Sequence, residues 1–199
     1  MAGSTSTSAA EPRALRADAR RNRERILAAA RDSFAESGRD VQMPEIARAA
    51  GVGVGTLYRH FPTKEALFEA IVIARLENLL ATAKAHAGAA DPVDALFRFL
   101  GEFAQQASAK RDLVESLSSA GIDIKSRCSA MFDEMKRSID VLLQRAVATG
   151  LVRADVSTDE MIGLVVGMCH AGGHPGSDAA ALPRMVDIVC NGLRAPTAT

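Results

Sequence analysis

One short stretch of the sequence carries a series of side chains that can donate hydrogen bonds or positive charge to an anionic partner. Thr56 has a hydroxyl group and Tyr58 a phenol, and Arg59, His60 and Lys64 follow them closely. Phosphate oxygens and the edges of bases in the major groove of DNA accept hydrogen bonds from such groups. The series therefore indicates a surface that binds nucleic acid.

Two short helices must position these side chains. The sequence predicts the first from about Met43 to Ala50, with Pro44 acceptable in its first turn, and the second from about Val54 to His60. Gly51-Val52-Gly53 makes the turn between them, and Pro62 ends the second helix. Two helices joined in this way form a helix-turn-helix, which presents its second helix to the major groove.

The opposite side of the second helix is apolar. Leu57 and Phe61 face away from the polar series, and we expect them to form a small core with Ile46, Phe34 and Leu67. This division into two faces is what a recognition helix requires.

A basic helix is predicted upstream, from about Ala17 to Glu36. Residues 1–64 hold 11 Lys and Arg against 7 Asp and Glu, whereas residues 65–199 hold 13 against 17. Most charge runs are solvated faces, but this one precedes a candidate DNA-binding motif and is well placed to neutralise phosphates. Arg20 and Arg23 are therefore included among the predicted DNA contacts, and residues 1–16 are predicted to be a disordered basic arm.

The segment GVGVGTLYRHFPTKEALFEA, from Gly51 to Ala70, resembles the recognition segment of the TetR family of bacterial transcriptional regulators. The common form of that segment is close to GVSxGTLYxHFxxKxxL. The resemblance also covers the basic helix and EIARAAGV, so that about residues 20–72 match as a unit. It implies that Thr56, Tyr58, His60 and Lys64 meet DNA, chiefly its phosphates.

Several positions keep more than one interpretation. Arg59 either reads guanine or binds a phosphate, and Gln42 either caps the helix that follows it or touches a phosphate. Gly53 stands where the family often has a capping Ser or Thr, and the entry Gln42-Met43-Pro44 also departs from the commoner Thr-rich form. The predicted DNA-binding residues are Gln42, Val54, Gly55, Thr56, Tyr58, Arg59, His60, Lys64, Arg20 and Arg23.

The rest of the chain has further helical periods and no convincing strand pattern. A long helix is predicted from about Lys64 to Ala85, with Thr63 as its cap, and a break follows at Gly88–Asp91. Later helices are predicted at about residues 92–109, 111–120, 125–148, 161–169 and 183–193. The family resemblance implies that the last two, Thr158–Cys169 and Ala180–Leu193, pair with their copies in a dimer; core helices of a monomer are the alternative.

The middle helices would hold a small-molecule effector. Aromatic and methionine side chains suit an adaptable apolar cavity, although each is also an ordinary core residue. The predicted lining consists of Phe97, Leu100, Phe103, Leu117, Met131, Met135 and Met168.

Other kinds of site are weakly supported. Cys169, His170 and His174 lie close together, but their spacing fits no standard zinc pattern. The chain has neither a GxSxG nucleophile elbow nor a phosphate-binding glycine loop, so no enzyme, metal or cofactor is predicted. It also has no apolar run of membrane-spanning length, and we expect it to be cytoplasmic.

The sequence as a whole predicts an all-α protein of about nine helices. A three-helix helix-turn-helix domain with a bridging fourth helix would occupy residues 17–87, and a helical effector-binding and dimerisation domain residues 88–199. The predicted function is a sequence-specific transcriptional regulator, a repressor that a small molecule releases from a near-palindromic operator. The alternatives are a DNA-binding protein without an effector, and a metal or redox sensor that uses Cys169, His170 and His174.

Overall fold

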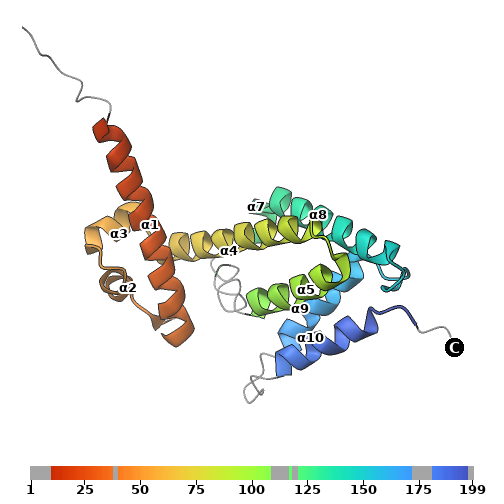
Figure 1. Cartoon of the computed structure of the whole chain (residues 1–199). Helices are drawn as coiled ribbons and strands as arrows, with labels where there is room; N and C mark the ends of the chain where they lie inside the picture. Colours follow the sequence, from red (N-terminus) through yellow and green to blue (C-terminus); the bar gives the residue numbers. More distant parts are fainter. Residues whose placement is uncertain (1–9, 38–39, 109–116, 118–120, 172–180, 197–199) are drawn as a thin grey trace, which may run out of the picture. The chain divides into compact units, whose positions relative to one another are not determined.

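The computed structural model describes residues 10–37, 40–108, 117, 121–171 and 181–196. Within these ranges the chain is helical, and strand-like pairing is confined to an isolated bridge between Val152 and Arg194. The helices, labelled in Figure 1, are α1 (Ala10–Ser37), α2 (Met43–Ala49), α3 (Val54–His60), α4 (Lys64–Ala87), α5 (Pro92–Ser108), α7 (Ile124–Arg127), α8 (Ser129–Ala148), α9 (Thr158–Ala171) and α10 (Ala181–Gly192). An all-α fold is confirmed.

The chain divides into two compact units, Met1–Ile71 and Val72–Thr199. The division falls inside α4, so this helix contributes its first turns to one unit and the remainder to the other. The sequence had placed the boundary after this helix, near residue 88.

The first unit packs α1, α2, α3 and the start of α4 around a small core. Ile26, Ile46, Leu57 and Leu67 are fully buried in it. Phe34 meets Phe68 edge to face, with ring centroids 4.4 Å apart. The predicted core-facing residues therefore do face inward.

One helix begins earlier than predicted. Residues 10–16 were assigned to a disordered arm, but α1 starts at Ala10. These residues include Ala, Leu, Arg and Glu, which are strong helix formers, and they extend the helix beyond the part that an apolar stripe can reveal.

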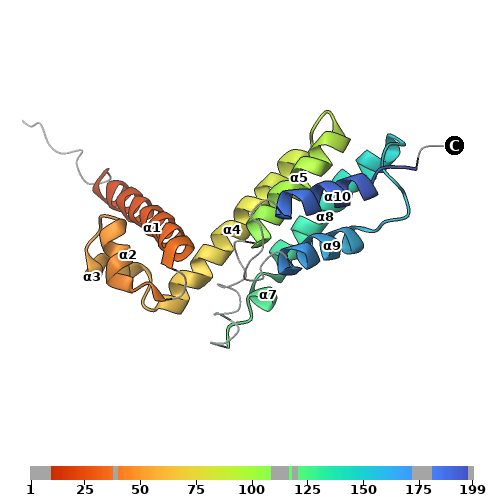
Figure 2. The ribbon, with the colours of Figure 1, turned by 90° about the horizontal axis from the view of Figure 1, so that it is seen from below.

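The second unit packs α5 against α8, α9 and α10, and Figure 2 shows these helices running side by side. Large side chains in its core are fully buried, among them Phe99, Ile139, Leu142 and Val165. Phe99 and Phe103 stack with their centroids 6.0 Å apart.

The end of α4 is fastened within this second unit by polar contacts. Arg145 of α8 donates to the carbonyls of Ala87 and Ala89, the latter at 2.7 Å. Lys84 pairs with Glu134 of α8 at 2.6 Å. The hydrogen bond from Lys84 holds the pKa of Glu134 below its ordinary value.

One predicted helix is divided in the structure. The period from 125 to 148 was read as continuous, but α7 ends at Arg127 and α8 begins at Ser129. Cys128 between them departs from helical geometry, with φ −111° and ψ 18°. The helix predicted at 111–120 lies outside the described residues apart from Leu117, which is buried.

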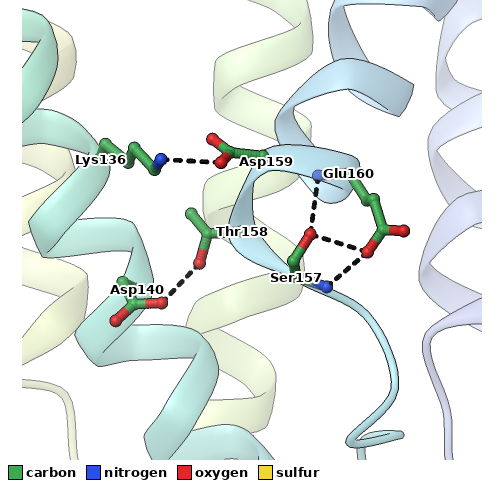
Figure 3. Close-up of polar contacts among 6 residues, drawn as sticks. All are labelled: Lys136, Asp140, Ser157, Thr158, Asp159 and Glu160. Atoms are coloured by element: carbon green, nitrogen blue, oxygen red, sulfur yellow. Dashed lines mark hydrogen bonds and ion pairs between the residues drawn. The ribbon is translucent and has the colours of Figure 1, made fainter.

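Polar contacts fix the start of α9 (Figure 3). Ser157 and Glu160 form a capping box, because the Ser157 hydroxyl accepts from the Glu160 amide and the Glu160 carboxylate accepts from the Ser157 amide. Thr158, nearly buried, donates to Asp140 of α8 at 2.7 Å, and Lys136 pairs with Asp159 at 2.8 Å. α9 is thus capped locally and tied to α8.

The end of the described chain is held by the loop before α9. The Arg153 amide donates to the Leu193 carbonyl and the Ala195 amide to the Leu151 carbonyl, both at 2.9 Å. Asp155 accepts two hydrogen bonds of 2.6 Å from the Arg153 guanidinium group.

Candidate nucleic-acid interface

The recognition helix α3 has one exposed and one buried face, as predicted. Tyr58 is 44% exposed and Val54 43% exposed, whereas Leu57 is completely buried. Gly55 and Arg59 are also exposed, and Thr56 and His60 are half-buried. The helix therefore presents a phenol, a guanidinium group and an open glycine to its surroundings.

The first turn of α3 is uncovered. Its N-cap is Gly53, which provides no side-chain cap, and the Gly53 carbonyl accepts from the amides of Thr56 and Leu57 at 2.9 and 3.1 Å. A methyl group added at Gly55 would meet nothing within 4 Å. A backbone so exposed at a helix N-terminus can approach an anion closely.

The start of α4 supplies another helix N-terminus in the first unit. Thr63 caps it as predicted, because its hydroxyl accepts from the Ala66 amide at 3.1 Å. The ammonium group of Lys64 lies 5.7 Å from the centre of the Phe68 ring. Lys64 is half-buried, so its charge is held close to the surface of the helix.

Gln42 is the N-cap residue of α2, which is one of the two roles weighed for it. The Glu45 carboxylate accepts from the Gln42 amide at 3.0 Å, and the Gln42 side chain donates to the Asp40 carbonyl at 2.6 Å. Its side chain is exposed beside the start of the motif.

The arginines of α1 do not share one environment. Arg20 is highly exposed and lies 3.7 Å from Glu24. The Arg23 guanidinium carbon lies 5.4 Å from the centre of the Phe61 ring, and Arg25 donates to the Gly51 carbonyl at 3.2 Å. Sequence reasoning did not select Arg25, since no local pattern pairs it with a carbonyl 26 positions away.

The predicted effector residues are distributed over two environments. Leu100, Phe103, Met135 and Met168 pack in the core of the second unit. Phe97 instead lines a groove of about 250 Å³ between α5 and α10. The other residues of this groove are Arg98, Gly101, Gln105, Leu182, Pro183, Val186 and Asp187; Met131, elsewhere on α8, is half-buried.

The cysteine and histidine cluster is only partly within the described chain. Cys169 is buried and its thiol donates to the Ala104 carbonyl of α5 at 3.3 Å. The side chain of His170 and all of His174 lie outside the described residues. No group of three potential metal ligands occurs among the residues that are described.

None of the described helices combines the length and apolar character needed to cross a membrane.

Two family models match the chain in sequence. The model described as "Bacterial regulatory proteins, tetR family" covers residues 26–71. The model described as "Transcriptional regulator SbtR-like, C-terminal domain" covers residues 91–195. Together they include both the helix-turn-helix and most of the second unit.

Individual proteins agree with these models. A TetR transcription regulatory protein from Mycobacterium vanbaalenii, solved by crystallography, is 38% identical, with 91% of this chain and 99% of that chain covered and a TM-score of 0.73. The HTH-type transcriptional regulator UidR of Escherichia coli K12 is 27% identical over 146 residues, which are 73% of this chain and 74% of that protein. The HTH-type transcriptional repressor KstR of Mycobacterium tuberculosis is 29% identical over 133 residues, covering 66% of this chain and 60% of that protein.

Proposed function

Since this chain belongs to the TetR family of bacterial transcriptional regulators, we propose that it is a repressor that a small-molecule effector releases from DNA. The observation that carries the proposal is the exposed face of α3, which offers Tyr58 and Arg59 beside an uncovered N-terminal turn. Its similarity to a mycobacterial repressor supports the sign of regulation. Such a protein acts where the chromosome lies, in the bacterial cytoplasm.

The proposed DNA contacts fall into two groups. Val54, Gly55, Thr56, Tyr58 and Arg59 lie on or beside the exposed face of α3 and would enter the major groove. Residues around this helix would bind phosphates and fix its register, as most protein contacts to DNA do. This second group comprises His60, Lys64, Gln42 and Arg20.

A homodimer would form through α9 and α10. Leu164 is 50% exposed on α9 and Ile188 is 70% exposed on α10, although both are large apolar side chains. Gly163 and Gly167 are exposed on the same face of α9 as Leu164, and small residues let a partner helix approach closely. Two copies related by a two-fold axis would contact half-sites roughly 34–36 Å apart.

The effector would act in the second unit. Because α4 begins beside the helix-turn-helix and its other end is fastened to α8 by Arg145 and Lys84, a ligand that moves these helices would also move α4. A shift of a few ångströms in the spacing of two recognition helices would prevent them from engaging both half-sites. The groove beside Phe97 and the core around Phe103 are the regions in which we would look for the ligand.

Selection of DNA from a random double-stranded pool tests the proposal directly. The full chain should enrich an inverted repeat whose half-sites are centred about one helical turn apart. Its affinity for that repeat should fall steeply as salt rises, because phosphate contacts release counterions. Failure to enrich any sequence, or binding that is insensitive to salt, would show that the assigned surface does not hold DNA.

A second candidate is a regulator without a small-molecule effector. It is favoured by the burial of Leu100, Phe103, Met135 and Met168 in the core of the second unit. A thermal-shift screen over chemically diverse small molecules separates the two. A compound that raises the melting temperature and also lowers operator affinity supports the effector; a regulator without one should show no such compound.

A further inference from the structure

Arginines of α1 contact the turn that precedes the recognition helix and the residue that ends it. Arg25 reaches the turn that leads into α3, and Arg23 lies over the residue that ends it. The two arginines are only two positions apart in the sequence. One short segment of α1 thus contacts the turn before the recognition helix and the residue at its end.

The contact at the beginning is built on the turn after α2. The amides of Gly51 and Val52 donate to the carbonyls of Arg48 and Ala47, both at 3.0 Å, which is the Schellman arrangement at a helix end. The carbonyl of Gly51 accepts a hydrogen bond of 3.2 Å from Arg25. Arg25 therefore ties the turn to α1.

Gly51 is needed for this contact in two ways. Its φ of +62° lies in the left-handed region that disfavours side chains. A Cβ atom at Gly51 would also lie 2.6 Å from Nη2 of Arg25, so the guanidinium group would have to move. The absence of a side chain is what lets the arginine approach the carbonyl.

The contact at the end uses an aromatic ring. Phe61 is the C-cap residue of α3, is only 3% exposed, and its amide donates to the Leu57 carbonyl at 2.8 Å. The Arg23 guanidinium carbon lies 5.4 Å from the ring centre, a distance typical of cation–π contacts. Since Phe61 is buried in the core, Arg23 contacts a residue whose position at the end of α3 is fixed by packing.

We propose that Arg23 and Arg25 are positioning residues for DNA recognition, which fix the orientation of α3 rather than neutralise phosphates. The proposal gives Arg23 a different role from the phosphate contact expected from sequence, and it leaves that role to Arg20. Among the described residues, Arg20 forms an exposed, 3.7 Å pair with Glu24, and it provides the comparison.

Salt dependence distinguishes the two roles. The full chain and its R20Q, R23Q and R25Q variants would be titrated with the selected operator, and with a random duplex of equal length, over a series of NaCl concentrations. R25Q should weaken operator binding by roughly tenfold and leave the slope of log affinity against log salt unchanged. R20Q should weaken both duplexes alike and reduce that slope by about two, because each protomer of the proposed homodimer loses one phosphate contact.

Double substitutions test whether each arginine acts through its proposed partner. G51A displaces the Arg25 guanidinium group, so R25Q should add little to the loss that G51A causes. F61L removes the ring while keeping an apolar side chain, so R23Q should likewise add little in that background. If either arginine lowered the salt slope, or kept its full effect when its partner had been changed, its positioning role would be wrong.

Amide hydrogen exchange of the free protein gives a readout that needs no DNA. R25Q should speed exchange at residues 51–54 while the melting temperature and the exchange of the second unit stay as in the parent chain. R20Q is the matched control, because it removes the same charge from the same helix and should leave these amides unchanged. Unchanged exchange at residues 51–54 in R25Q would overturn the proposal for Arg25 even if that variant bound DNA poorly.

Discussion

At the scale of single residues, two neighbours on α3 show how one helix can serve packing and recognition together. Leu57 is completely buried and Tyr58 is 44% exposed, although they are adjacent in the sequence. Adjacent positions of an α-helix are about 100° apart around its axis, so they point in clearly different directions. Position 57 therefore requires a side chain that packs in the core, whereas position 58 requires one that can contact a partner.

Truncation of the buried neighbour should destabilise the first unit. Leu57→Ala leaves a cavity beside Ile46 and Leu67, which are also fully buried, and such changes cost about 2–5 kcal/mol. Chemical denaturation followed by circular dichroism would measure the loss. A loss below about 1 kcal/mol would mean that Leu57 is not part of a well-packed core.

Removal of the phenolic hydroxyl from the exposed neighbour should lower operator affinity without lowering stability. Tyr58→Phe should leave the melting temperature unchanged, because the hydroxyl belongs to an exposed side chain. Operator affinity should fall by roughly thirtyfold, because each protomer of the proposed homodimer loses one hydrogen bond worth about 1 kcal/mol. Titration of the selected operator by fluorescence anisotropy measures this, and unchanged affinity would remove Tyr58 from the proposed contacts.

At the scale of helices, the sequence predicted best those boundaries that local chemistry determines. The start of α3 after Gly53 and its end before Pro62, and the cap of α4 by Thr63, agree with the structure. The break at Cys128 was missed, because an apolar stripe continues across it and no proline or glycine marks it. Propensity alone extends α1 back to Ala10, where no apolar stripe could guide the prediction.

The candidate site shows the same limit. The exposed face of α3 could be predicted, since it follows from helical periodicity within a few residues. The contact of Arg25 with Gly51 could not, because it depends on how α1 packs against the turn. Periodicity also could not decide which of the predicted pocket residues belong to the core. Phe103 is buried in the core, whereas Phe97 lines the groove between α5 and α10.

The capping box of α9 should contribute measurably to stability. Ser157→Ala removes the hydroxyl that accepts from the Glu160 amide at 3.2 Å, and the loss of such a cap costs about 1 kcal/mol. The free energy of unfolding in urea would reveal it. Ser138→Ala is a useful control, because that hydroxyl donates back to the Glu134 carbonyl of its own helix and its removal should cost little.

The loop before α9 should make stability depend on acid. Hydrogen bonds from Arg153 lower the pKa of Asp155 to about 2, whereas an unfolded aspartate titrates near 4, at about 3.9. A lowered folded pKa means that the stabilisation is complete above about pH 4 and is lost as pH falls toward 2.

The melting temperature of Asp155→Asn checks this. It should lie one or two degrees below that of the parent chain at pH 7, roughly the effect of an exposed ion pair. About half of the gap should close by pH 3, where the parent begins to lose the same contribution. A gap that is constant from pH 7 to pH 3 would contradict the assignment to this carboxylate.

At the scale of the whole molecule, the exposure of apolar side chains on α9 and α10 to water is unfavourable unless a second copy covers them. Ile188→Lys places a charge where the proposed dimer seam would bury an apolar side chain that is 70% exposed in the single chain. The variant should be monomeric by analytical ultracentrifugation. Its operator affinity should fall by at least about a hundredfold, because two linked half-site contacts become one.

Val141→Lys is the matched control for that variant. Val141 is 51% exposed on α8, which is not one of the two helices of the proposed seam, so its replacement should leave both the mass of the assembly and the operator affinity unchanged. If the two variants behaved alike, or if Ile188→Lys stayed dimeric, the seam would have to lie elsewhere.

The contacts that Arg23 and Arg25 make around α3 determine which segment must be transferred to build a regulator with a new operator. If only Val54–His60 were transplanted into another scaffold, the proposed DNA-contacting face would be transferred, but Arg23 and Arg25 of α1, which position it, would be lost. The transferable module is a larger piece, from Arg23 through Phe61, in which the arginines and their glycine and phenylalanine partners travel together. Chimaeras exchanged at that boundary should keep their parent's operator preference, whereas exchanges of the short helix alone should lose it.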